Sequence, residues 1–166
     1  MQTRSSTGRY AYRANSPARP ATNPDGKHAK LIHALGVHRQ LLTHAASSIR
    51  TLTAARNDLI AQAVEDGLTL ATISAVTGEN LRAVRTIALA YDDLHLSGLP
   101  RQAQLEALKA KSDELKAAEE HRGRITERRE ALIGMALRAQ VCDDLELASL
   151  TGLTPEHIRH ASRSHR

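Results

Sequence analysis

The sequence predicts an all-α fold in which a unit of three helices occurs twice. Two observations support this prediction. From Lys27 onward, apolar residues recur every three or four positions, and no run of alternating β-branched residues indicates a strand. The stretch RNDLIAQAVEDG, which begins at Arg56, also has a counterpart in REALIGMALRAQ, which begins at Arg129. An internal repeat of this kind is typical of a structural unit that is present in two copies.

The composition limits the kind of core that the chain builds. The 166 residues suffice for one domain or two small ones, and they include three Tyr but no Phe and no Trp. A core of Leu, Ile, Val and Ala suits close helix packing and argues against a large ligand-binding domain. The only cysteine, Cys142, excludes an intrachain disulfide and a cysteine-based metal cluster.

Positive charge is concentrated at the N-terminus. Residues 1–28 contain five basic residues and one acidic residue, which leaves 18 of the 23 basic and 17 of the 18 acidic residues for the rest of the chain. The segment is rich in Pro, Ser, Asn and Gly and has almost no aliphatic residue, so we expect it to form a disordered arm. A basic arm usually meets a polyanion, most often nucleic acid, and a solubilising tail is the alternative.

The first copy of the unit is expected to begin with a long helix. Apolar residues from Leu42 to Ala63 follow a three-four spacing that places them on one stripe, which Arg56 interrupts. Gly67 follows as a C-terminal stop signal.

Two shorter helices are expected next. Thr69 is placed to cap a helix over residues 70–76, and Gly78 ends that helix. Asn80 is placed to cap a second helix, which we expect to run over about residues 81–96.

The second copy follows a linker at residues 97–100, SGLP, where Gly and Pro together end helices. A second long helical pattern runs from there to about Gln140 and includes many charged residues at helical neighbour spacing. Gly123 lies within it, and the sequence leaves open whether this glycine splits the helix. Antiparallel packing of the two long helices through their Leu and Ala stripes is one arrangement that the sequence allows, and the relative placement of the two units is left open.

Two short helices again complete the copy. Asp143 or Asp144 is placed to cap a helix that reaches Leu150. Thr154 is placed to cap the last helix, with Pro155 in its first turn, where the missing N–H group costs nothing.

The two copies align over about 30 residues, with one extra residue in a turn of the second. The aligned pairs are Leu59 and Leu132, Ile60 and Ile133, Ala63 and Ala136, Leu68 and Val141, Ile73 and Leu147, Ser74 and Ala148, Gly78 and Gly152, Val84 and Ile158, and Arg85 and Arg159. Their order is an aliphatic and a small residue, then a turn glycine, then a β-branched residue six positions later. This pattern resembles that of the helix-turn-helix DNA-binding proteins. Leu153 follows the turn glycine of the second copy as in that family, whereas the first copy departs from the pattern with Glu79.

The resemblance implies which residues contact DNA, because the second helix of the motif enters the major groove and its N-terminal half meets base edges. The candidates in the first copy are Asn80, Arg82, Arg85 and Thr86, and those in the second copy are Thr154, Glu156, Arg159, His160 and Arg163. Arg binds guanine and Asn binds adenine in a bidentate manner, and Glu accepts a hydrogen bond from cytosine. Arg85 and Arg159 are the strongest candidates, since they occupy matching positions. Four arginines of the arm are candidates for the DNA backbone or the minor groove: Arg4, Arg9, Arg13 and Arg19.

Other kinds of site have little support in the sequence. The nine histidines do not align as a ligand set, and no nucleotide-binding loop or metalloprotease motif occurs, so we expect no metal, no cofactor and no enzymatic activity. No apolar run is long enough to span a membrane and the N-terminus does not resemble a secretory signal, so a cytoplasmic protein is expected.

The expected organisation is a disordered basic arm over residues 1–28 and two copies, over 29–98 and 99–166, of a long helix followed by a helix-turn-helix unit. The function predicted from this organisation is sequence-specific binding of double-stranded DNA, as in a transcriptional regulator or a plasmid or phage control factor. The alternative is a helical module that binds a partner protein, or a second copy of the chain, through the long helices.

Overall fold

The computed structural model describes residues 24–164, and every regular element in this range is an α-helix. The elements in chain order are α1 (Pro24–Glu65), α2 (Leu70–Thr77), α3 (Leu81–Leu89), α4 (Arg101–Arg138), α5 (Asp144–Thr151) and α6 (Pro155–Ser164). The all-α prediction is therefore confirmed. None of these helices is both long and apolar enough to cross a membrane.

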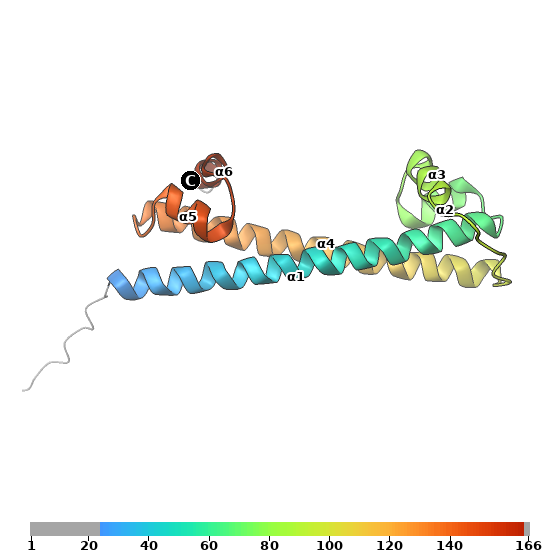
Figure 1. Cartoon of the computed structure of the whole chain (residues 1–166), viewed down its shortest axis with the longest axis horizontal. Helices are drawn as coiled ribbons and strands as arrows, with labels where there is room; N and C mark the ends of the chain where they lie inside the picture. The colour runs from blue at the N-terminus through green and yellow to red at the C-terminus, as the bar shows by residue number, and fades with distance from the viewer. Residues whose placement is uncertain (1–23, 165–166) are drawn as a thin grey trace, which may run out of the picture.

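The two long helices, α1 and α4, lie side by side in an antiparallel arrangement and form a rod (Figure 1). Only these two helices pass through the middle of the rod, and there they bury Ala45, Ile49 and Ile125. α4 continues through Gly123 without a break. A glycine inside a helix costs about 1 kcal/mol, which is small compared with the packing of a 38-residue helix along its partner. Among the arrangements that the sequence left open, the structure has the antiparallel one, with α4 unbroken.

α1 begins earlier than expected, because residues 24–28 are helical rather than part of a disordered arm. Proline is tolerated in the first turn of a helix, and Asp25 complements the positive end of the helix dipole there. The imidazole Nε2 of His28 lies 2.6 Å from the carboxylate of Glu146, which fixes this turn against α5. The arginines at positions 4, 9, 13 and 19 lie outside the described residues.

Two hydrophobic clusters, one at each end of the rod, hold the short helices. The buried residues of the first cluster are Ile60, Ala63, Leu68, Ile73, Val84 and Leu108. Those of the second are Leu31, Leu35, Ile133, Ala136, Cys142, Leu147, Ile158 and Ala161. Each cluster therefore combines one pair of short helices with both long helices. It contains residues from both of the expected copies, 29–98 and 99–166.

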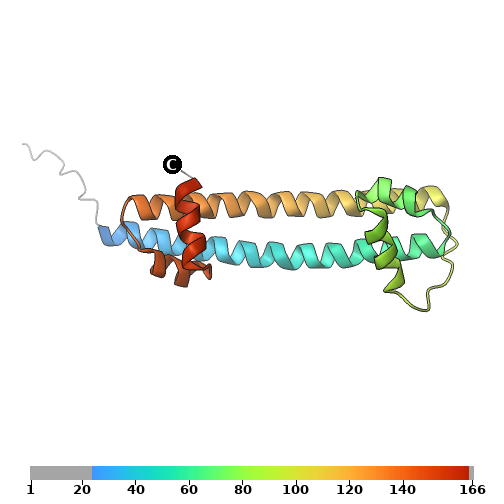
Figure 2. The same ribbon diagram turned by 90° about the horizontal axis from the view of Figure 1, so that it is seen from above.

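The two halves are related by an approximate two-fold rotation. Buried residues 73 or 74 positions apart take equivalent places in the two clusters, as Leu35 and Leu108 do. α2 packs on α4, whereas α5 packs on α1. Both pairs of short helices lie on the same face of the rod, and α3 and α6 cross it in opposite directions (Figures 1 and 2).

α3 is shorter than expected, since it ends at Leu89 rather than near residue 96. The segment that follows is held to α1 instead of continuing as a helix. Asp93 adopts a left-handed backbone conformation with φ of 58°. The backbone N–H of Ser97 donates to a carboxylate oxygen of Asp66 at 2.7 Å, and the amide of Gln62 donates to the carbonyl of His95 at 2.8 Å.

A substitution near the start of α1 is predicted to destabilise the cluster formed mainly by the C-terminal helices. Leu35 is 1% exposed, and Leu35→Ala is expected to lower the free energy of unfolding by about 2–5 kcal/mol. Leu41 of the same helix is 44% exposed, so Leu41→Ala is the control and should change it by less than about 1 kcal/mol. Chemical denaturation of both variants measures the difference, and equal losses would contradict the packing described above.

Candidate nucleic-acid interface

The turns that connect the short helices are built alike in the two halves. Gly78 ends α2 with φ of 77°, and Gly152 ends α5 with φ of 75°, a conformation that strains residues with a Cβ atom. The hydroxyl of Thr77 donates to the carbonyl of Ile73, and the hydroxyl of Thr151 donates to that of Leu147. These turns orient α3 and α6, and Val84 and Ile158 pin the two helices to the cores with no exposed surface.

Two of the predicted DNA-binding residues cap these helices. The side-chain oxygen of Asn80 accepts a hydrogen bond from the N–H of Ala83 at 2.8 Å, and the hydroxyl of Thr154 accepts one from the N–H of His157 at 3.3 Å. The predicted caps are therefore confirmed. Bidentate recognition of adenine needs both the oxygen and the amide nitrogen of an asparagine, so Asn80 does not provide it while it caps α3.

The remaining candidates in the first half lie on the outer face of α3. Arg82, Arg85 and Thr86 are all exposed. The hydroxyl of Thr86 donates to the carbonyl of Arg82, one turn earlier. Within residues 24–164 no carboxylate forms an ion pair with the guanidinium groups of these two arginines. Both positive charges are thus available to a ligand.

The candidates in the second half lie on the outer face of α6, but one of them already has a partner. Glu156, His160 and Arg163 are exposed. The Nε of Arg159 donates to a carboxylate oxygen of Asp144 at 2.9 Å, and this hydrogen bond lowers the pKa of Asp144. The second copy matches the sequence pattern better. Arg85 in the first copy nevertheless has no ion-pair partner among the described residues, whereas Arg159 in the second copy has one.

Glu79, the residue by which the first copy departs from the family pattern, is an ion-pair partner. Its carboxylate lies 2.7 Å from Nη1 of Arg56, whose side chain is 11% exposed. Arg56 is the residue that interrupts the apolar stripe of the first long helix. The guanidinium of Arg56 thus compensates the negative charge of Glu79, which would otherwise lie uncompensated beside α3.

Sequence reasoning missed Arg56 and Asp144 as parts of this surface. A charged residue within an apolar stripe is a signal that could have identified Arg56, since a buried arginine requires a partner. Asp144 carried no such signal, because its role depends on the position of α6 relative to α5.

The distance between the two surfaces follows from α4. Leu108 belongs to the first cluster and Ile133 to the second. The 25 residues between them correspond to about 38 Å at a rise of 1.5 Å per residue. This separation is shorter than the whole length of α4, because each pair of short helices folds back over the rod (Figure 2).

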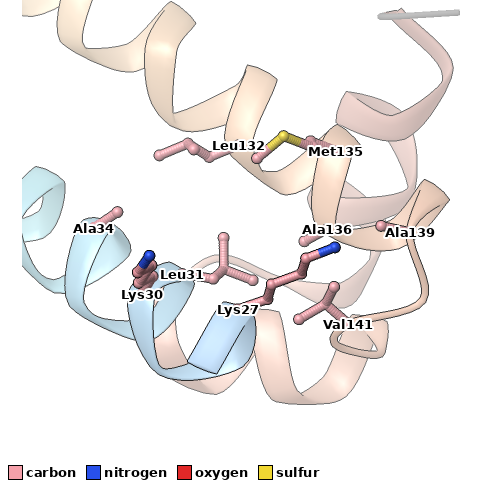
Figure 3. Close-up of a pocket in the computed structure, with 9 residues that line it drawn as sticks. All are labelled: Lys27, Lys30, Leu31, Ala34, Leu132, Met135, Ala136, Ala139 and Val141. Atoms are coloured by element: carbon pink, nitrogen blue, oxygen red, sulfur yellow. The ribbon is translucent and has the colours of Figure 1, made fainter. Parts of the chain in front are cut away.

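An apolar pocket of about 440 Å³ lies between the N-terminal part of α1 and the C-terminal part of α4 (Figure 3). Its lining residues are Lys27, Lys30, Leu31, Ala34, Leu132, Met135, Ala136, Ala139 and Val141. The two lysines are the only titratable groups among them, so the pocket has no acid–base pair for catalysis. In the first half, the positions equivalent to Met135 and Ala139 are Gln62 and Asp66, and these hold the linker after α3.

No protein-family model, curated protein sequence or solved structure matches this chain.

The ion pair between Arg159 and Asp144 is predicted to be visible in the titration of the carboxyl group. The guanidinium hydrogen bond lowers the pKa of Asp144 below its ordinary value of 3.8. At pH values above the ordinary pKa of an aspartate, the pair stabilises the folded chain. This stabilisation is lost as the pH falls through the lowered pKa of Asp144. Arg159→Gln is expected to return the pKa towards 3.8, as measured by carboxyl-carbon NMR. Arg163→Gln is the control, and an unchanged titration in Arg159→Gln would show that the pair does not form.

Proposed function

We propose that the protein binds double-stranded DNA and reads two sites on one face of the duplex with α3 and α6. The observation that carries this proposal is the placement of the two helices. They lie on one face of the rod, run in opposite directions and are about 38 Å apart by the rise of α4. Helix-turn-helix dimers place their recognition helices about 34–36 Å apart, one turn of B-DNA, with the same two-fold relation.

Each half contains the parts that such a reading requires. A short helix, a glycine turn and a second helix resemble the helix-turn-helix motif, and the outer face of the second helix carries polar and basic side chains. In α3 these are Arg82, Arg85 and Thr86, and in α6 they are Arg159, His160 and Arg163. The helix N-termini, capped by Asn80 and Thr154, present N–H groups that suit phosphate oxygens. The arginines of residues 1–23 remain candidates for backbone or minor-groove contacts.

The two half-sites are expected to differ in sequence. Both helices have an arginine at one equivalent position, Arg85 in α3 and Arg159 in α6. They differ at two others, where Arg82 is replaced by Glu156 and Leu89 by Arg163. A single chain with two unlike reading helices thus fits an imperfect inverted repeat. A role in transcriptional regulation, or in the control of a plasmid or phage, would follow from occupancy of such a site.

One observation favours a second function, the binding of a partner protein. Leu81 and Leu89 are 52% and 76% exposed, and they lie one turn before and one turn after Arg85 on α3. Large apolar side chains exposed together on one helix face also suit a protein interface. In this alternative the pairs of short helices serve as a docking surface, and DNA binding is absent.

Selection of bound sequences from a random duplex library, at stated salt concentrations, tests the DNA-binding function. The expected result is an imperfect inverted repeat whose half-sites have centres about 10–11 base pairs apart. Insertion of about five base pairs between the half-sites should abolish tight binding, because it turns one half-site to the opposite face of the duplex. No salt-dependent binding to any duplex would exclude the proposal and favour the protein-binding function.

Removal of one reading arginine is predicted to weaken binding at one half-site only. Arg85→Ala and Arg159→Ala should each cost about 1–3 kcal/mol of binding free energy on the selected site. Neither should reduce the thermal stability strongly, because both side chains are exposed. Arg50→Ala is the matched control, since Arg50 is exposed on α1 between the two surfaces. Fluorescence anisotropy measures the affinities, and an equal loss on random duplexes would indicate phosphate contacts without base recognition.

A further inference from the structure

Three metal-ligating side chains meet where the start of α1 crosses α5. They are His28 in the second turn of α1, Cys142 in the turn after α4, and Glu146 in the first turn of α5. One ligand atom from each residue lies within 4.8 Å of the other two. Cys142 is 7% exposed, and the side chains of His28 and Glu146 are 37% and 38% exposed.

The corresponding place in the first half has different chemistry. At the offset that relates the two copies, the equivalents of His28 and Glu146 are Arg101 and Thr72. Cys142 stands at the extra residue of the second copy, between Val141, the equivalent of Leu68, and Asp143, which caps α5 as Thr69 caps α2. Nη2 of Arg101 donates to the hydroxyl of Thr72 at 3.5 Å, so an ordinary hydrogen bond suffices to join the same helices in the first half. In the second half, a histidine and a glutamate meet beside a cysteine that the first half lacks.

The donor set selects a particular class of cation. A thiolate, an imidazole and a carboxylate are the ligands of Zn²⁺, whereas Ca²⁺ and Mg²⁺ prefer oxygen alone. Bond lengths of about 2.0–2.3 Å in a tetrahedral site place the ligand atoms about 3.3–3.8 Å from one another. The separation of 2.6 Å between the imidazole of His28 and the carboxylate of Glu146 then has to widen by roughly 1 Å. The sulfur of Cys142 already lies within 4.8 Å of both groups.

We infer that His28, Cys142 and Glu146 bind one Zn²⁺ ion, with water as the fourth ligand. Binding of the ion releases the proton of the Cys142 thiol to the solvent, because the thiolate and not the thiol is the metal ligand. The site joins the N-terminal end of α1 to α5 and so fixes the end of the rod that carries α6.

Titration of the full chain with Co²⁺, a spectroscopic substitute for Zn²⁺, tests this inference. One equivalent is expected to give a thiolate-to-cobalt charge-transfer band in the near ultraviolet and intense visible bands typical of a tetrahedral site. One equivalent of Zn²⁺ should remove both sets of bands by displacement. The absence of the charge-transfer band in the unmodified chain would by itself overturn the inference.

Three variants assign the ligands. Cys142→Ser should abolish the charge-transfer band, and His28→Gln and Glu146→Gln should each weaken the affinity by more than about 100-fold, since even residues that only support a ligand contribute 10–100-fold. Glu146→Gln also retains the thiol, so it remains informative if Cys142→Ser fails to fold. His33→Gln is the matched control, because His33 is exposed on the same helix. An equal loss in His33→Gln, or unchanged affinity in Glu146→Gln, would show that the cation binds surface histidines instead.

Discussion

The antiparallel packing of α1 against α4 is the interaction on which the rest of the structure depends. The four short helices contain only eight to ten residues each, and isolated helices of this length are not stable in water. They are stable here because each pair packs into a cluster that both long helices complete. Leu108 of α4 belongs to the core around α2 and α3, and Leu31 and Leu35 of α1 belong to the core around α5 and α6. The separation of the long helices would therefore expose both cores at once.

The features that sequence reasoning predicted correctly are local ones. The caps Thr69 and Asn80 and the turn glycines Gly78 and Gly152 are determined by residues within a few positions of one another, and the structure contains all of them. The contacts that it missed join distant segments, as with Arg159 and Asp144 or His28 and Glu146. The end of α3 at Leu89 is of the same kind, because Asp66 on α1 holds the segment that follows. The histidines carried no metal signal in the sequence, since Cys142 and Glu146, the other two proposed ligands, lie more than 110 residues from His28.

The two ends of the rod are packed alike but differ in the chemistry of their outward side chains. Packing residues such as Ile60 and Ile133 are retained, whereas outward residues differ between the copies. Glu79 pairs with Arg56 in the first half, but its equivalent in the second half is the apolar Leu153. The same scaffold thus presents a freer arginine on α3 and a paired one on α6. Under the proposed function, these differences assign a different base preference to each end without changing the distance between them.

The central claim is that α3 and α6 lie about 38 Å apart on one face of the rod. Pulsed electron–electron double resonance measures this distance directly. Spin labels on cysteines introduced at Thr86 and His160, which are exposed and equivalent in the two copies, report this separation in a Cys142→Ser background whose helical circular dichroism matches that of the unmodified chain. The rod predicts one narrow distribution centred at about 35–45 Å, from the rise along α4 and the length of the labels. A broad distribution, or one centred beyond about 55 Å, would contradict a rigid antiparallel rod that presents both helices on one face.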